Sequence, residues 1–158
     1  MRWLARHERT VFVGQSVAYD GATIYDSLDG VPEEKRLEMP VVEEFQMGYC
    51  IGMSLCDIVP ISIYPRIDFL LLALNQLVNH LDKLPSFGWR PKVIVRTRVG
   101  SKWPLNAGPQ HTQNHSMAIR AMLDTVNVIE VCKPYEVQEA YQRAYLSQGS
   151  FVIVENPL

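Results

Sequence analysis

The chain has 158 residues, of which 47% are apolar and 20% are charged, and its formal net charge at pH 7 is −2. This length and composition fit one ordinary globular domain. Because the chain is not basic and has no run of about 18 apolar residues, we expect neither a nucleic-acid partner nor insertion into a membrane.

The first half of the chain predicts strand, loop, helix and strand. Residues 10–18 form a β-rich run that Gly14 interrupts, and a polar loop with turn signals continues to Pro40. From there to Asp57 the apolar residues leave almost no polar face after the first turn, which predicts a helix buried on most sides. Residues 58–64 are a short β-branched run and predict the second strand.

The second half predicts further alternation of helices and strands. We expect a long helix over residues 66–84, a strand over 92–99 and a polar loop over 100–113, and loops of that length are usually functional. The remaining elements are a helix (114–124), a strand (126–131), a helix (134–147) and a strand (151–155). This order predicts an α/β fold, a mostly parallel sheet with helices on both faces, whose ligands lie at the carboxyl ends of the strands.

We expect residues 1–10 to be an N-terminal extension and residues 11–158 to be the domain. Cys50, Cys56 and Cys132 are odd in number, have no CxxC spacing and lie in apolar segments, so we expect reduced core thiols. The N-terminal segment is basic and lacks the apolar stretch of a signal peptide, which predicts a cytoplasmic location.

Six segments carry a family resemblance, and they are GQSVAYDGA, MPVVEEFQMGYCIGMSL, IVPISIYPRIDFLLLALNQLVNHL, VIVRTRVG, GPQHTQNHS and VNVIEVCKP. In their order and spacing, over about residues 11–157, they resemble the pyrimidine-binding domain of the transketolase-like thiamine-diphosphate enzymes. The beta chain of the 2-oxo acid dehydrogenase decarboxylating component is the member that the sequence resembles most. The resemblance implies the thiamine-diphosphate-binding (pyrimidine domain) fold.

The resemblance also implies roles for three residues. In the family, a glutamate with glycines five and nine residues later contacts the aminopyrimidine ring of the cofactor, and Glu43, Gly48 and Gly52 match this spacing. Phe69 matches the aromatic residue that stacks on the pyrimidine. His111 matches a histidine that faces the reacting centre from a long loop.

The residues by themselves leave other interpretations open. Glu43 and Glu44 can be first-turn carboxylates that the helix dipole favours, and for Glu44 we adopt that interpretation. Phe69 suits a hydrophobic core as well as a cofactor pocket, and so does Tyr64, which we also consider as a cofactor-binding residue.

The long loop is flanked by cations and contains two histidines. Arg96, Arg98 and Lys102 can contact an anionic substrate or remain solvated. His111 and His115 have no acidic or thiol third ligand nearby, so we expect no metal site in this chain. We expect His115 to be solvent-exposed at the start of a helix.

The resemblance further implies a partner chain. In the family, a GDG motif in a separate domain holds the diphosphate of thiamine diphosphate through Mg²⁺, and these 158 residues contain no GDG. We therefore expect a diphosphate-binding partner subunit, an alpha-like chain, and a homo- or hetero-oligomer. Two departures from the family are Gln15 and Ser16, where beta chains often carry acidic residues, and a second, C-terminal domain that these residues do not include.

Our leading hypothesis is a pyrimidine-binding subunit of an enzyme that decarboxylates a 2-oxo acid or transfers its acyl or aldehyde group. We expect activity only with the partner chain. The RTRVG and QHTQ segments favour a 2-oxo acid over the ketose substrates of a transketolase-like enzyme. A non-catalytic scaffold that keeps the fold is the alternative from another class, although a scaffold needs none of Glu43, Phe69 and His111.

Overall fold

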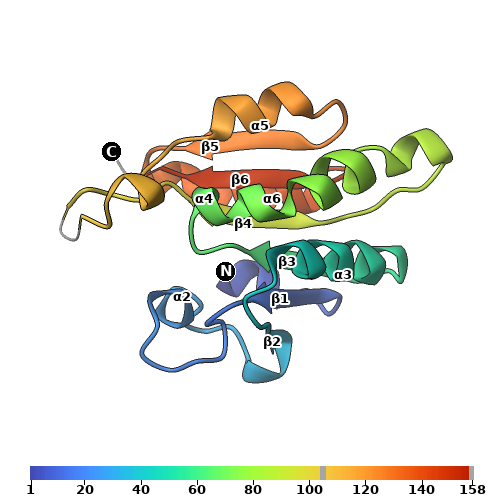
Figure 1. The fold of residues 1–158 in the computed structure, drawn as a ribbon. Helices are drawn as coiled ribbons and strands as arrows, with labels where there is room; N and C mark the ends of the chain where they lie inside the picture. The colour runs from blue at the N-terminus through green and yellow to red at the C-terminus, as the bar shows by residue number, and fades with distance from the viewer. Residues whose placement is uncertain (104–105, 157–158) are drawn as a thin grey trace.

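The computed structural model describes residues 1–103 and 106–156 (Figure 1). At its centre is a six-stranded sheet in which every pair of neighbouring strands is parallel. The spatial order is β2-β1-β3-β4-β6-β5. The strands are β1 (Thr10–Gly14), β2 (Arg36–Glu38), β3 (Val59–Ile63), β4 (Ile94–Arg98), β5 (Asn127–Val131) and β6 (Phe151–Glu155). The expected α/β class with a parallel sheet is confirmed.

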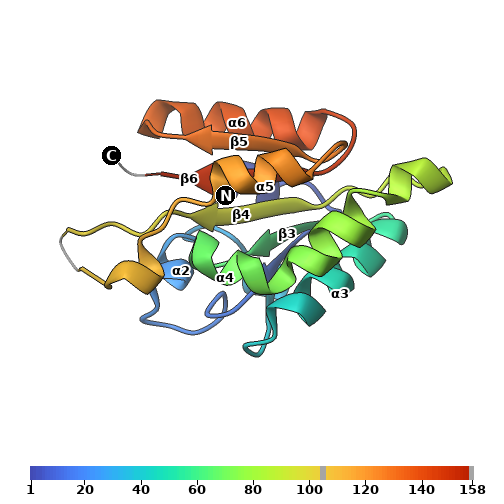
Figure 2. The same ribbon diagram turned by 45° about the horizontal axis from the view of Figure 1, so that its top comes forward.

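Helices cover both faces of the sheet (Figures 1 and 2). One face carries α3 (Glu43–Leu55), α4 (Ile67–Leu70) and α5 (Ser116–Met122), and the other carries α1 (Arg2–Ala5) and α6 (Pro134–Leu146). The short α2 (Thr23–Asp26) lies in the connection between β1 and β2. Because successive side chains of a strand point to opposite faces, Val95 joins the core under α3, whereas Ile94 joins the core under α6.

The first residues of the chain pack onto this fold. Leu4 is 1% exposed, and the Thr10 hydroxyl donates a hydrogen bond to its carbonyl oxygen at 2.8 Å. Leu4 and Ala5 therefore share a core with β1, and the division at residue 10 stays a prediction. Within the part of the chain that the structure describes, no helix has the length and apolar character needed to cross a bilayer.

The edge strand β2 lies in a segment that we expected to be loop. Its three residues pair with the end of β1, with Arg36 opposite Phe12 and Glu38 opposite Gly14. A strand this short and polar does not show the alternation by which a strand is predicted.

Residues 66–84 do not form the single α-helix that their spacing predicts. After α4 the chain makes a 3-10 turn over Leu71–Ala73 and a π-helix over Asn75–Leu81. The amide of Asp82 donates to the carbonyl oxygen of Leu77 at 3.0 Å, the five-residue step of a π turn. This wider turn brings the consecutive residues Leu81 and Asp82 into the interior, where both are fully buried.

Asp82 ties the end of this segment to the start of β5. Its carboxylate accepts hydrogen bonds from the amides of Asp124, Thr125 and Val126 at 3.1, 2.7 and 2.9 Å, and from Lys83 Nζ at 2.8 Å. Burial alone would raise the pKa of this carboxyl, but these donors hold it below its usual range. The ionised carboxylate is therefore a structural clamp.

Candidate functional site

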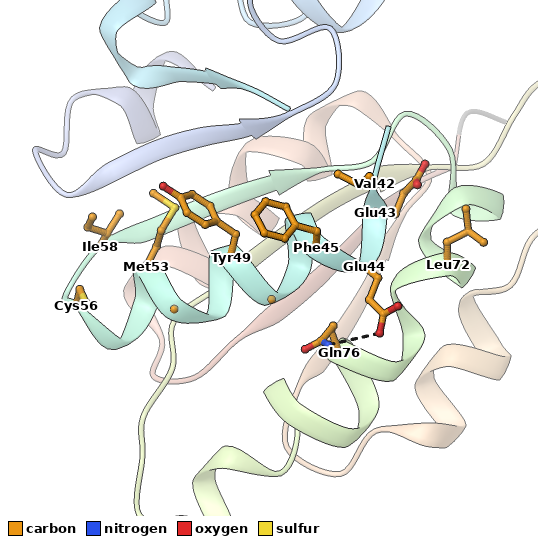
Figure 3. A pocket seen from close by; sticks show the side chains of 12 residues that line it. Val42, Glu43, Glu44, Phe45, Tyr49, Met53, Cys56, Ile58, Leu72 and Gln76 are labelled. Carbon is orange, nitrogen blue, oxygen red and sulfur yellow. Dashed lines mark hydrogen bonds between the residues drawn. The ribbon is translucent and has the colours of Figure 1, made fainter. Parts of the chain in front are cut away.

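An open groove of about 1040 Å³ follows the outer side of α3. Phe45 and Tyr49 stand along it with their rings stacked at 5.9 Å, and Met53 continues the row (Figure 3). Phe45 is 60% exposed and Leu72, across the groove, is 63% exposed. The expectation that this helix is buried on most sides is therefore wrong, because no described residue of this chain covers its outer apolar face.

Glu43, the first residue of α3, lies at the N-terminal end of that row (Figure 3). It lines the groove but is only 6% exposed. Gln15 Nε2 donates to its Oε1 at 3.3 Å and is the one described residue that hydrogen-bonds the carboxylate. The backbone amides of the first helical turn also favour a negative charge at this position. The carboxylate is thus held in place and keeps unused acceptor capacity.

The turn after β1 aims Gln15 at Glu43. A Cβ on Gly14 would lie 2.5 Å from the carbonyl oxygen of Ile63, so only glycine fits between these strands without a shift. Ser16 adopts a left-handed conformation with φ of 59°, and its amide donates to Glu38 at 2.5 Å. Gln15, noted above as a departure from the family, therefore contacts Glu43 directly.

Gln46 fixes the start of α3 to the sheet. It is fully buried, and its Nε2 donates to the Ser62 hydroxyl at 3.1 Å and to the Ile63 carbonyl oxygen at 3.0 Å. We did not single out this residue from the sequence. Its position three residues after Glu43, on the same side of the helix, is the signal that could have found it.

Tyr64 holds the backbone of Glu43 in place from the interior of the fold. The side chain is 1% exposed, and its hydroxyl donates to the backbone oxygen of Glu43 at 3.3 Å. Burial raises the pKa of this hydroxyl far above its ordinary value, so the group remains a donor. Tyr64 therefore holds the beginning of α3 and does not line the groove.

Phe69 and His111 lie against each other at the carboxyl edge of the sheet. Their rings meet edge to face, with centroids 5.5 Å apart, and both residues are partly buried. Phe69 comes from α4, and His111 comes from the 3-10 turn Pro109–His111 in the loop after β4. The structure thus joins Tyr64 with Glu43 and Phe69 with His111.

Arg96 and Arg98 lie on the face of the sheet that α6 covers, opposite the face that carries α3. Both line a separate pocket of about 400 Å³ beside α6. Arg96 forms an ion pair with Glu155 at 2.9 Å and also donates to the Ser27 hydroxyl at 2.8 Å. Since the structure does not bring these arginines together with Glu43, their contact with a substrate stays a prediction.

Three further expectations concern thiols, metals and His115. Cys50 is buried, and burial raises the pKa of its thiol to about 12, whereas Cys132 is partly buried. Cys56 is exposed, so the expectation of a core thiol is wrong there.

His115 is partly buried, with 21% of its side chain exposed, so its expected exposure is wrong too. Among residues 1–103 and 106–156, no three His, Cys, Asp or Glu side chains are grouped to hold a metal ion.

Comparison with known proteins gives several dehydrogenase subunits, of which two represent different enzymes. The chain is 25% identical over 165 residues to the mitochondrial pyruvate dehydrogenase E1 component subunit beta of Homo sapiens. It is 21% identical over 165 residues to the 2-oxoisovalerate dehydrogenase subunit beta of Bacillus subtilis. The chain resembles the beta subunits of the 2-oxo acid dehydrogenases. These matches cover 98% and 97% of this beta-like chain but 44% and 48% of the relatives, so it spans about half their length.

The structural comparison agrees with the resemblance. A split-gene transketolase, in an inactive beta4 tetramer, superposes with a TM-score of 0.76 at 16% identity, over 98% of this beta-like chain and 47% of that one. No family model matches the chain. The transketolase-like fold expected from the sequence is confirmed.

Proposed function

We propose that this chain is the pyrimidine-binding subunit of a thiamine-diphosphate-dependent enzyme that acts on a 2-oxo acid, and that it is active only with a diphosphate-binding partner chain. The observation that carries the proposal is the buried Glu43 carboxylate at the end of a groove that no described residue covers. The likeness to two 2-oxo acid dehydrogenase beta subunits supports this substrate class over a ketose.

The residues around Glu43 suit an aminopyrimidine ring. Glu43 keeps acceptor capacity for a ring nitrogen, because Gln15 is its one described donor. Phe69 offers an aromatic ring at the same edge of the sheet, already in contact with His111. Thiamine diphosphate, when bound, supplies the carbon nucleophile that attacks the substrate carbonyl.

Each side chain then has a defined task. Glu43 shares a proton with a pyrimidine nitrogen, and Gln15 and Tyr64 orient that glutamate through its Oε1 and its backbone oxygen. His111 is the polar group on the substrate side. The diphosphate and its Mg²⁺ belong to the partner chain in this proposal, since the GDG motif that holds them in the family is not among these 158 residues.

We propose that the partner chain binds to the outer face of α3. A Cβ on Gly52 would touch nothing within 4 Å, and one on Gly48 would meet only the end of Gln76 at 3.5 Å. Each glycine costs a helix about 1 kcal/mol relative to alanine, and packing against the described residues does not require either of them. Together with exposed Phe45 and Tyr49 they suit close approach of another helix. An assembly of beta-like chains alone, as in the split-gene transketolase, is the alternative oligomer.

The test is 2-oxo acid decarboxylation by the chain mixed with a GDG-bearing subunit encoded beside it, thiamine diphosphate and Mg²⁺. We expect activity only in the mixture and its loss with Glu43→Gln. Glu139→Gln is the control, because Glu139 is an exposed glutamate of α6, which packs on the opposite face of the sheet. Equal activity of the Glu43→Gln mixture would refute the role of Glu43, and turnover of ketoses alone would favour the transketolase-like alternative.

A further inference from the structure

The loop that carries His111 is tied to the turn that carries Phe69. Arg66 Nη1 donates to the backbone oxygen of His111 at 3.3 Å, and Gln113 Nε2 donates to Asp68 Oδ1 at 3.4 Å. The Phe69 and His111 rings add an edge-to-face contact between the same two segments. The turn and the loop therefore form one unit, although 45 residues separate Arg66 from His111.

A glycine two residues beyond β4 permits this close approach. A Cβ on Gly100 would lie 1.8 Å from the backbone oxygen of His111 and 2.5 Å from Arg66 Nη1. Backbone cannot move aside as the end of a flexible side chain can. The backbone of His111 is thus placed by main-chain geometry, and its neighbours determine where the ring lies.

A carboxylate and an imidazole are enclosed next to this unit, on the residue before Phe69 and on the fourth residue after His111. The side chains of Asp68 and His115 are 6% and 21% exposed, and His115 Nε2 lies 3.8 Å from Asp68 Oδ1. Asp68 Oδ2 and His115 Nε2 are buried and have no hydrogen-bond partner among the described residues. Burying a polar atom without a hydrogen-bond partner is unfavourable, so the nearness of the other polar group lowers the free-energy cost of burying each one.

The other end of the loop is anchored on β5. The Ser116 hydroxyl donates to Glu130 Oε2 at 2.6 Å, and Asn114 Nδ2 donates to Glu130 Oε1 at 2.9 Å. His115 lies between these two anchored residues. The approach of the His115 ring to Asp68 therefore connects the segment anchored on Glu130 of β5 to the turn that carries Phe69.

We propose that Asp68 and His115 are a positioning pair that sets the place of the His111 ring. Neither residue touches the reacting atoms in this account. The proposal rests on the proposed function only where it places His111 on the substrate side, and the positional claim is independent of any reaction.

The first test uses the full chain without substrate. The ring C–H resonances of His111 are followed by NMR in Asp68→Ala and His115→Leu. Leucine fills a volume similar to that of the histidine, so His115→Leu keeps the test available if Asp68→Ala does not fold. We expect the His111 resonances to shift in both variants and to return toward wild type in His115→Gln, which retains a side-chain donor and acceptor. Met117→Ala, at a residue 70% exposed in α5, is the control. Unchanged His111 resonances in a folded His115→Leu variant would overturn the positioning pair.

The second test uses the assembled enzyme. Misplacing a catalytic group by about 1 Å costs up to about 100-fold in rate, so we expect His115→Leu to lower kcat at least about tenfold with little change in KM, and His115→Gln to restore part of it. Unaltered kcat in a variant whose His111 resonances have moved would overturn the link between the pair and catalysis. A wild-type complex that is inactive on every 2-oxo acid would refute the proposed function, while the resonances would still decide the positioning pair.

Discussion

Gln15 Nε2 lies 3.3 Å from Glu43 Oε1, and this hydrogen bond joins the turn after β1 to the first residue of α3. The two residues are 28 positions apart in the chain and come from neighbouring parts of the carboxyl edge of the sheet. A parallel sheet gathers the ends of its strands at one edge, so residues distant in sequence meet there. Glu43 owes its fixed orientation to this arrangement.

Gln15→Ala should weaken cofactor binding by the assembled complex without unfolding the chain. A hydrogen bond to a charged group contributes about 1.5 to 3 kcal/mol, so we expect a loss of roughly tenfold or more in affinity. Calorimetric titration with thiamine diphosphate and Mg²⁺ measures it, and Gln138→Ala on the exposed part of α6 is the control. An affinity equal to that of the wild type would show that Gln15 does not orient Glu43.

Gln46→Ala should destabilise the chain strongly. It removes the donor to the Ser62 hydroxyl and the Ile63 carbonyl oxygen and leaves a space in a fully buried position. Buried groups that lose their partners cost about 1 to 3 kcal/mol each, which gives an expected loss of about 2 to 4 kcal/mol. Urea unfolding of the isolated chain measures this difference, and a change below about 0.5 kcal/mol, the level of surface substitutions, would contradict it.

Asp82→Asn should lower stability in a pH-dependent way. The folded-state pKa of Asp82 is depressed, so the ionised carboxylate stabilises the fold above its unfolded pKa of about 3.9, and that contribution is lost as pH falls below this value toward the folded pKa. We expect the variant to be about 2 to 4 kcal/mol less stable at pH 7 and the gap to narrow below about pH 4. Urea unfolding at pH 7, 5, 4 and 3 follows this gap, and a constant gap would argue against an ionised clamp.

Two glycine variants should change stability in opposite directions. Gly52→Ala should stabilise the isolated chain by about 0.5 to 1 kcal/mol, because the new methyl group meets nothing and alanine favours the helix. Gly14→Ala should destabilise it by about 1 to 3 kcal/mol, because its methyl group would press on the Ile63 carbonyl oxygen. Thermal unfolding compares the two, and destabilisation by Gly52→Ala would mean that the outer face of α3 is packed within the chain.

The same face gives a prediction about assembly. Gly52→Leu should leave the isolated chain folded and prevent association with the partner, because a larger side chain would stand where another helix approaches. Sedimentation velocity of the mixture reports the complex. Unimpaired assembly of Gly52→Leu would place the partner elsewhere.

The regular elements could be predicted because their patterns are local. The strand over residues 151–155 and the helix that starts at Pro134 agree with the structure nearly residue for residue. The π turn before Asp82 could not be predicted, because it depends on donors from residues 124–126 that are distant in sequence. The exposure of Phe45 and Tyr49 was missed because an apolar residue has the same pattern whether its own chain or another one covers it.

The candidate site shows the same division. The family resemblance pointed to Glu43, Phe69 and His111, and residue types at fixed spacing suffice for that. The contacts that support Glu43 and its helix come from Gln15 and Gln46 and join separate elements across the sheet edge. Helical spacing could point to Gln46 as a residue, but no local pattern predicts which groups either side chain bonds. Their roles become visible only when the strand order is known.

The role of Glu43 in a cofactor site shared with a partner is tested by calorimetric binding of thiamine diphosphate with Mg²⁺ to this chain, alone and mixed with the GDG-bearing subunit, using wild type, Glu43→Ala and Glu139→Gln. We expect binding only in the mixture, lost with Glu43→Ala and kept with Glu139→Gln. Absence of binding in the wild-type mixture, although the two chains associate, would contradict this expectation and favour a scaffold that has kept the fold.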